Sequence, residues 1–349
     1  MINYVNAQFD EVSIHYIGDH AQSEGIKISP TSVKVNDDNL KNLLLHYYFD
    51  NFKEPEFFSF TFLEDDIEMN PVYKYVSEIF DDPNQLHAQS QIIAKYLYNQ
   101  SVHPNIKSGD FMMSYIEDVI VDDELVSAII IFKSEAKDSF LKLTQRNDHY
   151  NIDHQKGINI NKLDKACVIF NTEKEDGFKL CVIDKSNRNR DALYWRQDFL
   201  NVESRSDDYY KTKVYIQATK AFVNDRLKPL YDLDKADEAY ILNASQSYLK
   251  QEESFDESNY LDSLFGDEEK VKREFGQYKK DYQEENQVQL YDNFDVSPAA
   301  VKNQSRIFKS VLKLDKNFHI YIHGNRNMIE KGVDDDGRKY YKIFYENEN

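Results

Sequence analysis

Ala166-Cys-Val-Ile-Phe170 and Phe178-Lys-Leu-Cys-Val-Ile183 are the two runs that decide the fold of this chain. Both are short, apolar and rich in β-branched residues, which is typical of buried strands. Glu175-Asp-Gly177 lies between them and has the composition of a turn, so we predict an antiparallel hairpin. A basic loop from Lys185 to Arg190 follows, and then the chain's one tryptophan, Trp195.

The residues before this hairpin predict a mixed α+β domain that spans residues 1–148. Apolar residues at helical spacing predict helices at Asn39–Phe52, Val72–Phe80 and Gln85–Tyr98. An alternating run predicts a strand at Val12–Ile17, and an aromatic run predicts one at Phe57–Leu63. Three further strands are expected in series, with a turn at Val121–Glu124, as an antiparallel meander: Asp110–Ile120, Glu124–Phe132 and Ser139–Thr144.

Residues 149–349 predict a second α+β domain with long helices and a small antiparallel sheet. Helices are expected at Asp208–Leu227, ended by Pro229, and at Ala236–Lys250. Residues 251–289 form an acidic segment whose apolar residues recur at helical spacing, so we predict exposed helices there. Ser297-Pro298 opens a short helix, and Phe318–His323 is expected to pair with Lys339–Tyr345.

The charge balance limits which partners the chain can bind. The 349 residues carry 62 Asp and Glu against 43 Lys and Arg, a formal net charge of −19. Such a surface repels phosphate at long range, so any contact with DNA requires a local cationic patch or a partner protein. The N-terminus does not resemble a signal peptide, and no apolar run is long enough for a membrane span, so we expect a cytoplasmic protein.

The sequence predicts no catalytic, metal or cofactor site. Cys167 and Cys181 lie inside apolar runs and are expected to be buried, reduced thiols. His149 and His154 flank Asp153, which is too few ligands for a metal site, and Asp334-Asp-Asp-Gly337 is better explained as a tight turn than as a calcium loop. Nucleotide-binding, serine-hydrolase and zinc-protease motifs do not occur, so we expect no enzymatic activity.

Several motifs together resemble the 37-kDa nucleoid-associated proteins of bacteria. They are Lys156-Gly-Ile-Asn-Ile-Asn-Lys-Leu-Asp-Lys-Ala166, Tyr194-Trp-Arg196 and His323-Gly-Asn-Arg326 with the residues up to Gly332, along with the region of Ile14-His15. The likeness extends over most of the chain. It implies residence on the nucleoid and association with DNA, with a decatenating type II topoisomerase as a partner, and it assigns no catalytic residues.

The first candidate DNA-binding surface is a basic stretch near the C-terminus. The stretch from Lys302 to Arg326 contains six Lys and Arg residues and one acidic residue, Asp315. We predict that Lys309, Lys313, Lys316 and Arg326 contact phosphates. The alternative is that a solvated basic helix in this stretch neutralises the acidic segment 251–289 of the same molecule.

The second candidate surface is the loop after the central hairpin. Lys185, Arg188, Arg190 and Arg196 are suited to backbone phosphates, and Trp195 is suited to stacking on a base or sugar. The alternative is a surface loop followed by a tryptophan that anchors the core.

These observations predict a non-enzymatic nucleoid-associated protein. It is expected to bind DNA weakly and without sequence preference, directly or with a partner, and to form a homodimer. One alternative is an adaptor whose acidic region Tyr260–Tyr282 binds a basic protein such as a topoisomerase. Another is a component of a defence system.

Overall fold

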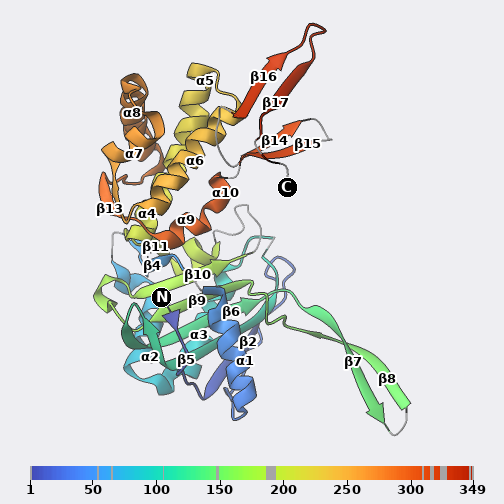
Figure 1. Ribbon diagram of the computed structural model, residues 1–349. Helices are drawn as coiled ribbons and strands as arrows, with labels where there is room; N and C mark the ends of the chain where they lie inside the picture. The colour runs from blue at the N-terminus through green and yellow to red at the C-terminus, as the bar shows by residue number, and fades with distance from the viewer. Residues whose placement is uncertain are drawn as a thin grey trace. The chain divides into compact units, whose positions relative to one another are not determined.

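The computed structural model describes residues 2–52, 55–63, 66–104, 106–146, 149–185, 194–308, 310–314, 318–322, 328–345 and 347. Contacts divide the chain into two compact units, Met1–Arg205 and Ser206–Asn349. Each unit combines helices with antiparallel strands, which confirms the α+β class (Figure 1).

The first unit is built on an antiparallel sheet, nine-stranded within the described residues. Its central strand pairs are the longest, and short strands lie at both edges. The order across the sheet is β11 (Val202–Ser204), β4 (Phe57–Phe60), β10 (Lys179–Asp184), β9 (Lys165–Phe170), β6 (Glu124–Ser134), β5 (Gly109–Val121), β2 (Glu11–Ile17) and β3 (Val33–Lys34), with β1 (Ile2–Asn3) also paired to β5.

The predicted central hairpin is confirmed as β9 and β10, which pair from Lys165↔Asp184 to Phe170↔Lys179. A 3₁₀ turn, Lys174–Asp176, joins them, and Gly177 follows with φ +86°. A Cβ at Gly177 would lie 2.4 Å from the carbonyl oxygen of Phe60, so both the backbone angle and the close approach require glycine.

The two cysteines lie on opposite faces of this hairpin. Cys167 is opposite Val182 and Cys181 is opposite Val168, a register offset of one residue. Because side chains alternate between faces along a strand, this offset sends the two thiols into different cores. Both are free and fully buried, as predicted, and burial raises the pKa of each thiol.

Helices cover both faces of the sheet. α2 (Pro71–Asp81), α3 (Leu86–Gln100) and the π-helix Tyr194–Leu200 supply apolar side chains to the core on one face. α1 (Asp38–Phe49) and the 3₁₀ turn Asp50–Phe52 supply them on the other. α1 to α3 lie where the sequence predicted helices, and the Asp37 carboxylate caps α1 by accepting from the N–H groups of Asn39 and Leu40.

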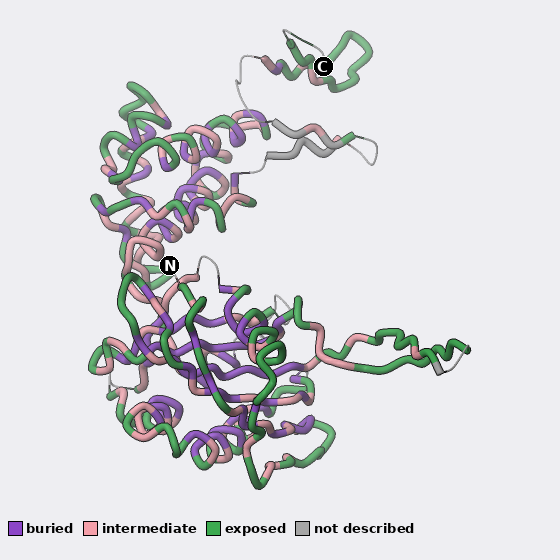
Figure 2. The backbone as a smooth tube through the Cα atoms, turned by 60° about the horizontal axis from the view of Figure 1, so that its bottom comes forward, coloured by how far each residue is buried: buried purple, intermediate pink, exposed green. Residues whose placement is uncertain are grey.

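The predicted three-stranded meander is wrong at its third strand. β5 and β6 pair as expected, but the second neighbour of β6 is β9. All six residues of β9 are buried, so it suits the interior of the sheet, whereas β7 is mostly exposed. β7 (Asp138–Arg146) instead pairs with β8 (His149–Gly157). These two strands form an arm that extends beyond the sheet and is exposed over most of its length (Figures 1 and 2).

The two compact units do not divide at the predicted boundary of 148/149. β9, β10 and β11 follow that position in sequence but are hydrogen-bonded into the sheet of the first unit. The contacts therefore place the division after Arg205.

The second unit is mainly helical around an aromatic core. Its helices are α4 (Asp208–Phe222), the π-helix Val223–Leu227, α5 (Lys228–Tyr231), α6 (Lys235–Gln251), α7 (Glu257–Phe265), α8 (Glu269–Asn286), α9 (Pro298–Asn303) and α10 (Ser305–Phe308). β12 (Ser254–Asp256) pairs with β13 (Asn293–Asp295). Tyr215, Phe255, Tyr260 and Phe275 are buried together in this core, and the acidic segment is folded, as predicted.

Pro229 does not end the helical stretch where we predicted. It lies in the first turn of α5, directly after the π-helix, and the helical conformation continues through the proline to Tyr231. The chain leaves the helix at Asp232, which has φ +48° and donates its N–H to the Lys228 carbonyl.

Two hairpins complete the second unit. β14 (Ser310–Leu314) pairs with β15 (Phe318–Ile322), and β16 (Ile329–Val333) pairs with β17 (Lys339–Ile343). The expected pairing of Phe318–His323 with Lys339–Tyr345 is therefore wrong. Each strand pairs instead with its neighbour in sequence, and the predicted turn Asp334–Gly337 closes the second hairpin, with Gly337 at φ +80°.

Candidate nucleic-acid interface

Three of the eight predicted DNA-contact residues lie in the described part of the chain. Lys185 and Arg196 flank the central loop, and the backbone of Lys313 lies in β14 opposite His319. The remaining five lie outside the described residues: Arg188, Arg190, Lys309, Lys316 and Arg326. The structure therefore leaves the two surfaces as predictions.

Lys185 and Arg196 are held by neutral partners. The Lys185 N–H donates to the Asp164 carbonyl over 2.9 Å, and its ammonium donates to the Asn51 side-chain oxygen over 2.7 Å. The Arg196 guanidinium lies over the Phe58 ring, 4.7 Å from its centroid. A hydrogen bond to an amide and a contact with a ring leave the positive charge in place, so both side chains keep the charge that a phosphate requires.

Trp195 belongs to the core, as the alternative expected of the tryptophan, whereas the loop before it, residues 186–193, lies outside the described residues. Its ring is fully buried, lies 4.8 Å from the Phe199 ring, and donates its N–H to the Ala166 carbonyl over 3.4 Å. A buried indole has no free face, so Trp195 is not a platform for a base.

The hairpin β16–β17 carries further cations that the sequence argument did not select. The register places Lys331 opposite Tyr341 and Lys339 opposite Val333, so Lys331 and Lys339 share one face. Both lysines are exposed, and neither forms an ion pair with another described residue. The run of basic residues that continues past Arg326 was the signal that could have identified them.

The other cations of this hairpin are compensated, and its base is anchored. Arg338 pairs with Asp336 at 2.9 Å, and Lys342 lies 3.7 Å from Glu330 and 4.6 Å from the Phe344 ring centroid. Ile329 is buried against Ala236 of α6, with Tyr341 packed alongside. One end of the ribbon is therefore fixed to a helix while its lysines remain open to solvent.

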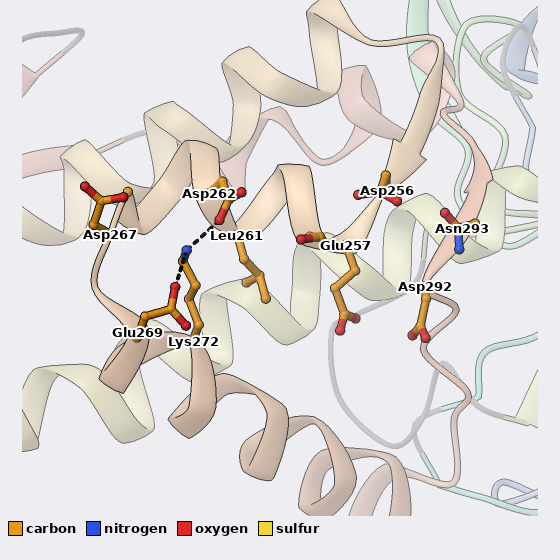
Figure 3. A pocket seen from close by; sticks show the side chains of 11 residues that line it. Asp256, Glu257, Leu261, Asp262, Asp267, Glu269, Lys272, Asp292 and Asn293 are labelled. Carbon is orange, nitrogen blue, oxygen red and sulfur yellow. Dashed lines mark hydrogen bonds and ion pairs between the residues drawn. The ribbon is translucent and has the colours of Figure 1, made fainter.

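An acidic hollow lies between α7, α8 and the β12–β13 pair. It has a volume of about 890 Å³. Figure 3 shows Asp262 and Glu269 beside Lys272, and the carboxylates that line the hollow belong to Asp256, Glu257, Asp262, Asp267, Glu269 and Asp292. Lys272 donates to Asp262 over 2.5 Å and to Glu269 over 3.0 Å, and these hydrogen bonds raise the pKa of the ammonium.

The acidic segment is neutralised in part by its own lysines. Lys279 bridges Glu257 and Asp292, and Arg226 lies 3.7 Å from Glu274. The ion pairs that the structure gives for residues 251–289 thus come from Lys272, Lys279 and Arg226. Whether cations between Lys302 and Arg326 also neutralise residues 251–289 stays a prediction.

His149, Asp153 and His154 lie on the exposed strand β8. Across the described ranges, no three His, Cys, Asp or Glu side chains are grouped so that they could hold a metal ion. Nor does any helix in these ranges combine the length and apolarity needed to cross a membrane.

Comparison with known proteins gives one family. No curated protein matches the chain. Residues 13–338 of the 349 match the family described as nucleoid-associated protein YejK. This match covers nearly the whole chain, including both compact units, and the chain therefore belongs to that family of nucleoid-associated proteins.

Proposed function

We propose that this protein acts on the nucleoid by binding DNA without sequence preference, mainly through its C-terminal basic segment, residues 302–342. The observation that carries the proposal is a local reversal of charge. This segment holds ten Lys and Arg against five Asp and Glu, whereas the whole chain has 43 against 62. Because the chain belongs to a family of nucleoid-associated proteins, DNA is the polyanion that we expect this basic segment to bind.

The hairpin β16–β17 is suited to phosphate contact. Lys331 and Lys339 project from the same face of a ribbon whose base is packed on α6. Lysines are point charges that release counterions when they meet phosphates, and they read no bases. Binding by such a surface is independent of sequence and is weakened by salt.

The −19 charge opposes this contact at long range. We therefore expect weak binding alone and tighter binding when a partner protein supplies further cations. The topoisomerase implied by the family resemblance is one candidate for that partner. We propose a binding role and no enzymatic one, so plasmid DNA should stay intact when incubated with the pure protein and Mg²⁺.

The test is a gel shift on duplex DNA from about 50 to 200 mM salt, a range over which a protein that makes several phosphate contacts loses affinity by orders of magnitude. Lys331→Glu with Lys339→Glu should weaken binding and reduce the salt slope by about 2, since each lost phosphate contact removes about 0.9. A second variant changes Lys309, Lys313, Lys316 and Arg326 to Glu.

The matched control is Lys74→Glu with Lys95→Glu, which changes the net charge equally at exposed positions of α2 and α3. Equal loss of binding in the control would show that overall charge, and not the C-terminal basic segment, governs the affinity. Binding by the wild type that does not change with salt would contradict the proposal as a whole.

A second candidate function is an adaptor that holds a basic protein segment in the acidic hollow. The hollow favours it because six carboxylates and a single lysine, Lys272, line it. Charge reversal of Glu268, Glu269 and Glu274, of which Glu269 lines the hollow, should then abolish capture of the partner and leave DNA binding unchanged or stronger. Because Glu269 and Glu274 have ion-pair partners of their own, Asp267→Lys is the milder variant that separates docking from folding.

A further inference from the structure

The arm β7–β8 has no core of its own. Its strands pair from Asp138↔Gly157 to Arg146↔His149 and extend from the first unit as a ribbon (Figures 1 and 2). Its base is tied down by Asp138, which accepts from Asn159 over 2.7 Å and pairs with Lys162 at 2.9 Å. Beyond that base, no described residue of the arm belongs to a hydrophobic core of the protein.

One face of the arm is apolar. Leu143 is opposite Ile152, and Leu141 and Tyr150 lie two residues away from that pair on the same face. These four side chains, which we call the apolar arm face, are 63–75% exposed. The neighbouring pair Thr144↔Asn151 points to the opposite face and is polar.

A partner is needed to bury this face. Burial of apolar surface stabilises by about 25 cal/mol per Å², and a two-stranded ribbon alone is marginally stable in water. Isolated apolar side chains on a surface are ordinary, but four that are contiguous on an extended ribbon indicate an interaction site.

The charges around this face indicate what kind of partner it is. Its remaining positions are Ser139, Gln145, His154 and Lys156, so the face contains no carboxylate. Two copies of a chain with net charge −19 repel each other over most of their surfaces. The apolar arm face is a place where two copies can meet without bringing carboxylates together.

The same composition disfavours nucleic acid as the partner. Ribbons that enter a DNA groove carry Arg and Lys along their length and insert single apolar side chains between bases. Here four large apolar side chains are adjacent, and the one lysine of the face, Lys156, lies near the base of the arm.

We infer that the apolar arm face binds the same face of a second copy, so that the protein is a dimer joined through its arms. An isologous contact of this kind has two-fold symmetry. With the axis along the arm, Leu143 of one copy packs on Ile152 of the other. The Leu141 and Tyr150 side chains lie on either side of this central contact, level with His154 and Gln145 of the other copy.

The experiment compares two double variants by sedimentation equilibrium and light scattering. Leu143→Lys with Ile152→Lys places two cations on the apolar arm face, and Thr144→Lys with Asn151→Lys places the same two charges one residue further along on the opposite face. The wild type and the Thr144/Asn151 variant should have twice the 41.2 kDa chain mass. The Leu143/Ile152 variant should have the single-chain mass, with the dissociation constant raised at least about 100-fold, as for loss of an interface centre.

Crosslinking tests the face directly. Leu143→Cys should be joined between copies by a short bismaleimide, and Thr144→Cys should not, because Thr144 lies on the opposite face. The native Cys167 and Cys181 are fully buried and do not compete for the reagent. Thermal unfolding should be equal in all variants, since the arm lies outside the cores.

Three results would overturn the inference: a monomeric wild type, a dimer that both double variants leave intact, or a dimer that both disrupt equally. If the wild type is monomeric and the Leu143/Ile152 variant alone loses DNA affinity, the arm is instead a ribbon that enters DNA.

Discussion

The Lys165 ammonium lies 2.7 Å from a carboxylate oxygen of Asp184, and both side chains are almost completely buried, at 1% and 3% exposure. The two residues are register partners on β9 and β10. Lys133, the register partner of Lys165 on β6, is buried beside them and pairs with Glu135 at 2.9 Å. The Tyr194 ring covers this row, with its centroid 4.9 Å from the Lys165 ammonium.

Removing one partner of this pair should destabilise the first unit strongly. Lys165→Met removes the ammonium that donates to the buried Asp184 carboxylate, and breaking one side of a buried ion pair costs about 3–5 kcal/mol. Lys165→Met with Asp184→Leu should recover most of that loss, because an apolar pair has no buried charge. The free energy of unfolding is measured in urea by the fluorescence of Trp195, the sole tryptophan, which lies in the core of the first unit.

The control is Lys162→Met, the same substitution in the solvent-exposed pair with Asp138. It should cost less than about 1 kcal/mol. A double variant that is no more stable than Lys165→Met would show that the charges of the ion pair stabilise the first unit beyond what apolar side chains of similar size can replace.

Asn70 joins the start of α2 to the chain that enters β11. Its carbonyl oxygen accepts from the N–H groups of Val72 and Tyr73, and its amide donates to the carbonyls of Thr61, Leu200 and Asn201. Asn70→Asp keeps the helix cap but brings a carboxylate against those carbonyls in a fully buried site. We expect a loss of about 2 kcal/mol or more, from unsatisfied buried groups and repulsion.

Asp37→Asn at the start of α1 is the matched control, because it makes the converse exchange at a more exposed helix cap. Asn and Asp cap helices about equally well, so its effect should be within about 0.5 kcal/mol. Equal losses at both positions would mean that the donated hydrogen bonds of Asn70 contribute little.

Local patterns in the sequence predicted most elements but not their partners. The alternation in Val12–Ile17 and the stripe in Asn39–Phe52 depend on residues near each other, so β2 and α1 lie where expected. That β6 lies beside β9 and not β7 depends on contacts between residues far apart in sequence, which alternation does not encode. The misassigned pairing near the C-terminus has another cause: β14 and β16, the neighbours in sequence of the two predicted strands, were not predicted as strands.

The candidate sites were less predictable than the fold. A run of cations indicates a basic segment, but the face that a given lysine occupies depends on strand register, as Lys331 and Lys339 show. The buried row of Lys133, Lys165 and Asp184 was not anticipated, because charged residues at strand ends usually face solvent.

The thiols of Cys167 and Cys181 should react with a thiol reagent only after unfolding. Burial raises the pKa of both, and the thiolate is the reactive form. Native protein should therefore show no fast-reacting thiol and denatured protein two. Because the two side chains point into different cores, oxidant should not link them in the folded state. A disulfide found in native protein would contradict the register of β9 and β10.

His15 should make the first unit less stable in acid. Burial, with a smaller contribution from nearby His87, lowers the pKa of His15 from 6.5 to about 4. Its Nδ1 accepts from the Ser29 N–H over 3.1 Å, and its Nε2 lies 2.9 Å from the Ser90 hydroxyl. A proton added at Nδ1 would face another donor, so the folded state holds the ring neutral.

The sign follows from the lowered folded-state pKa. Between pH 6.5 and about 4 the unfolded chain binds a proton at His15 that the folded chain does not, so the stability contributed by His15 is present above pH 6.5 and is lost as the pH falls towards 4. The loss from pH 7 to pH 4.5 is about 2 kcal/mol, at about 1.4 kcal/mol per pKa unit. Urea unfolding followed by Trp195 fluorescence at both pH values should show it as a smaller dependence on pH in His15→Gln than in the wild type. His149→Gln, on the exposed strand β8, should keep the wild-type dependence. A His15→Gln variant with an unchanged pH dependence would show that His15 is not the group that titrates.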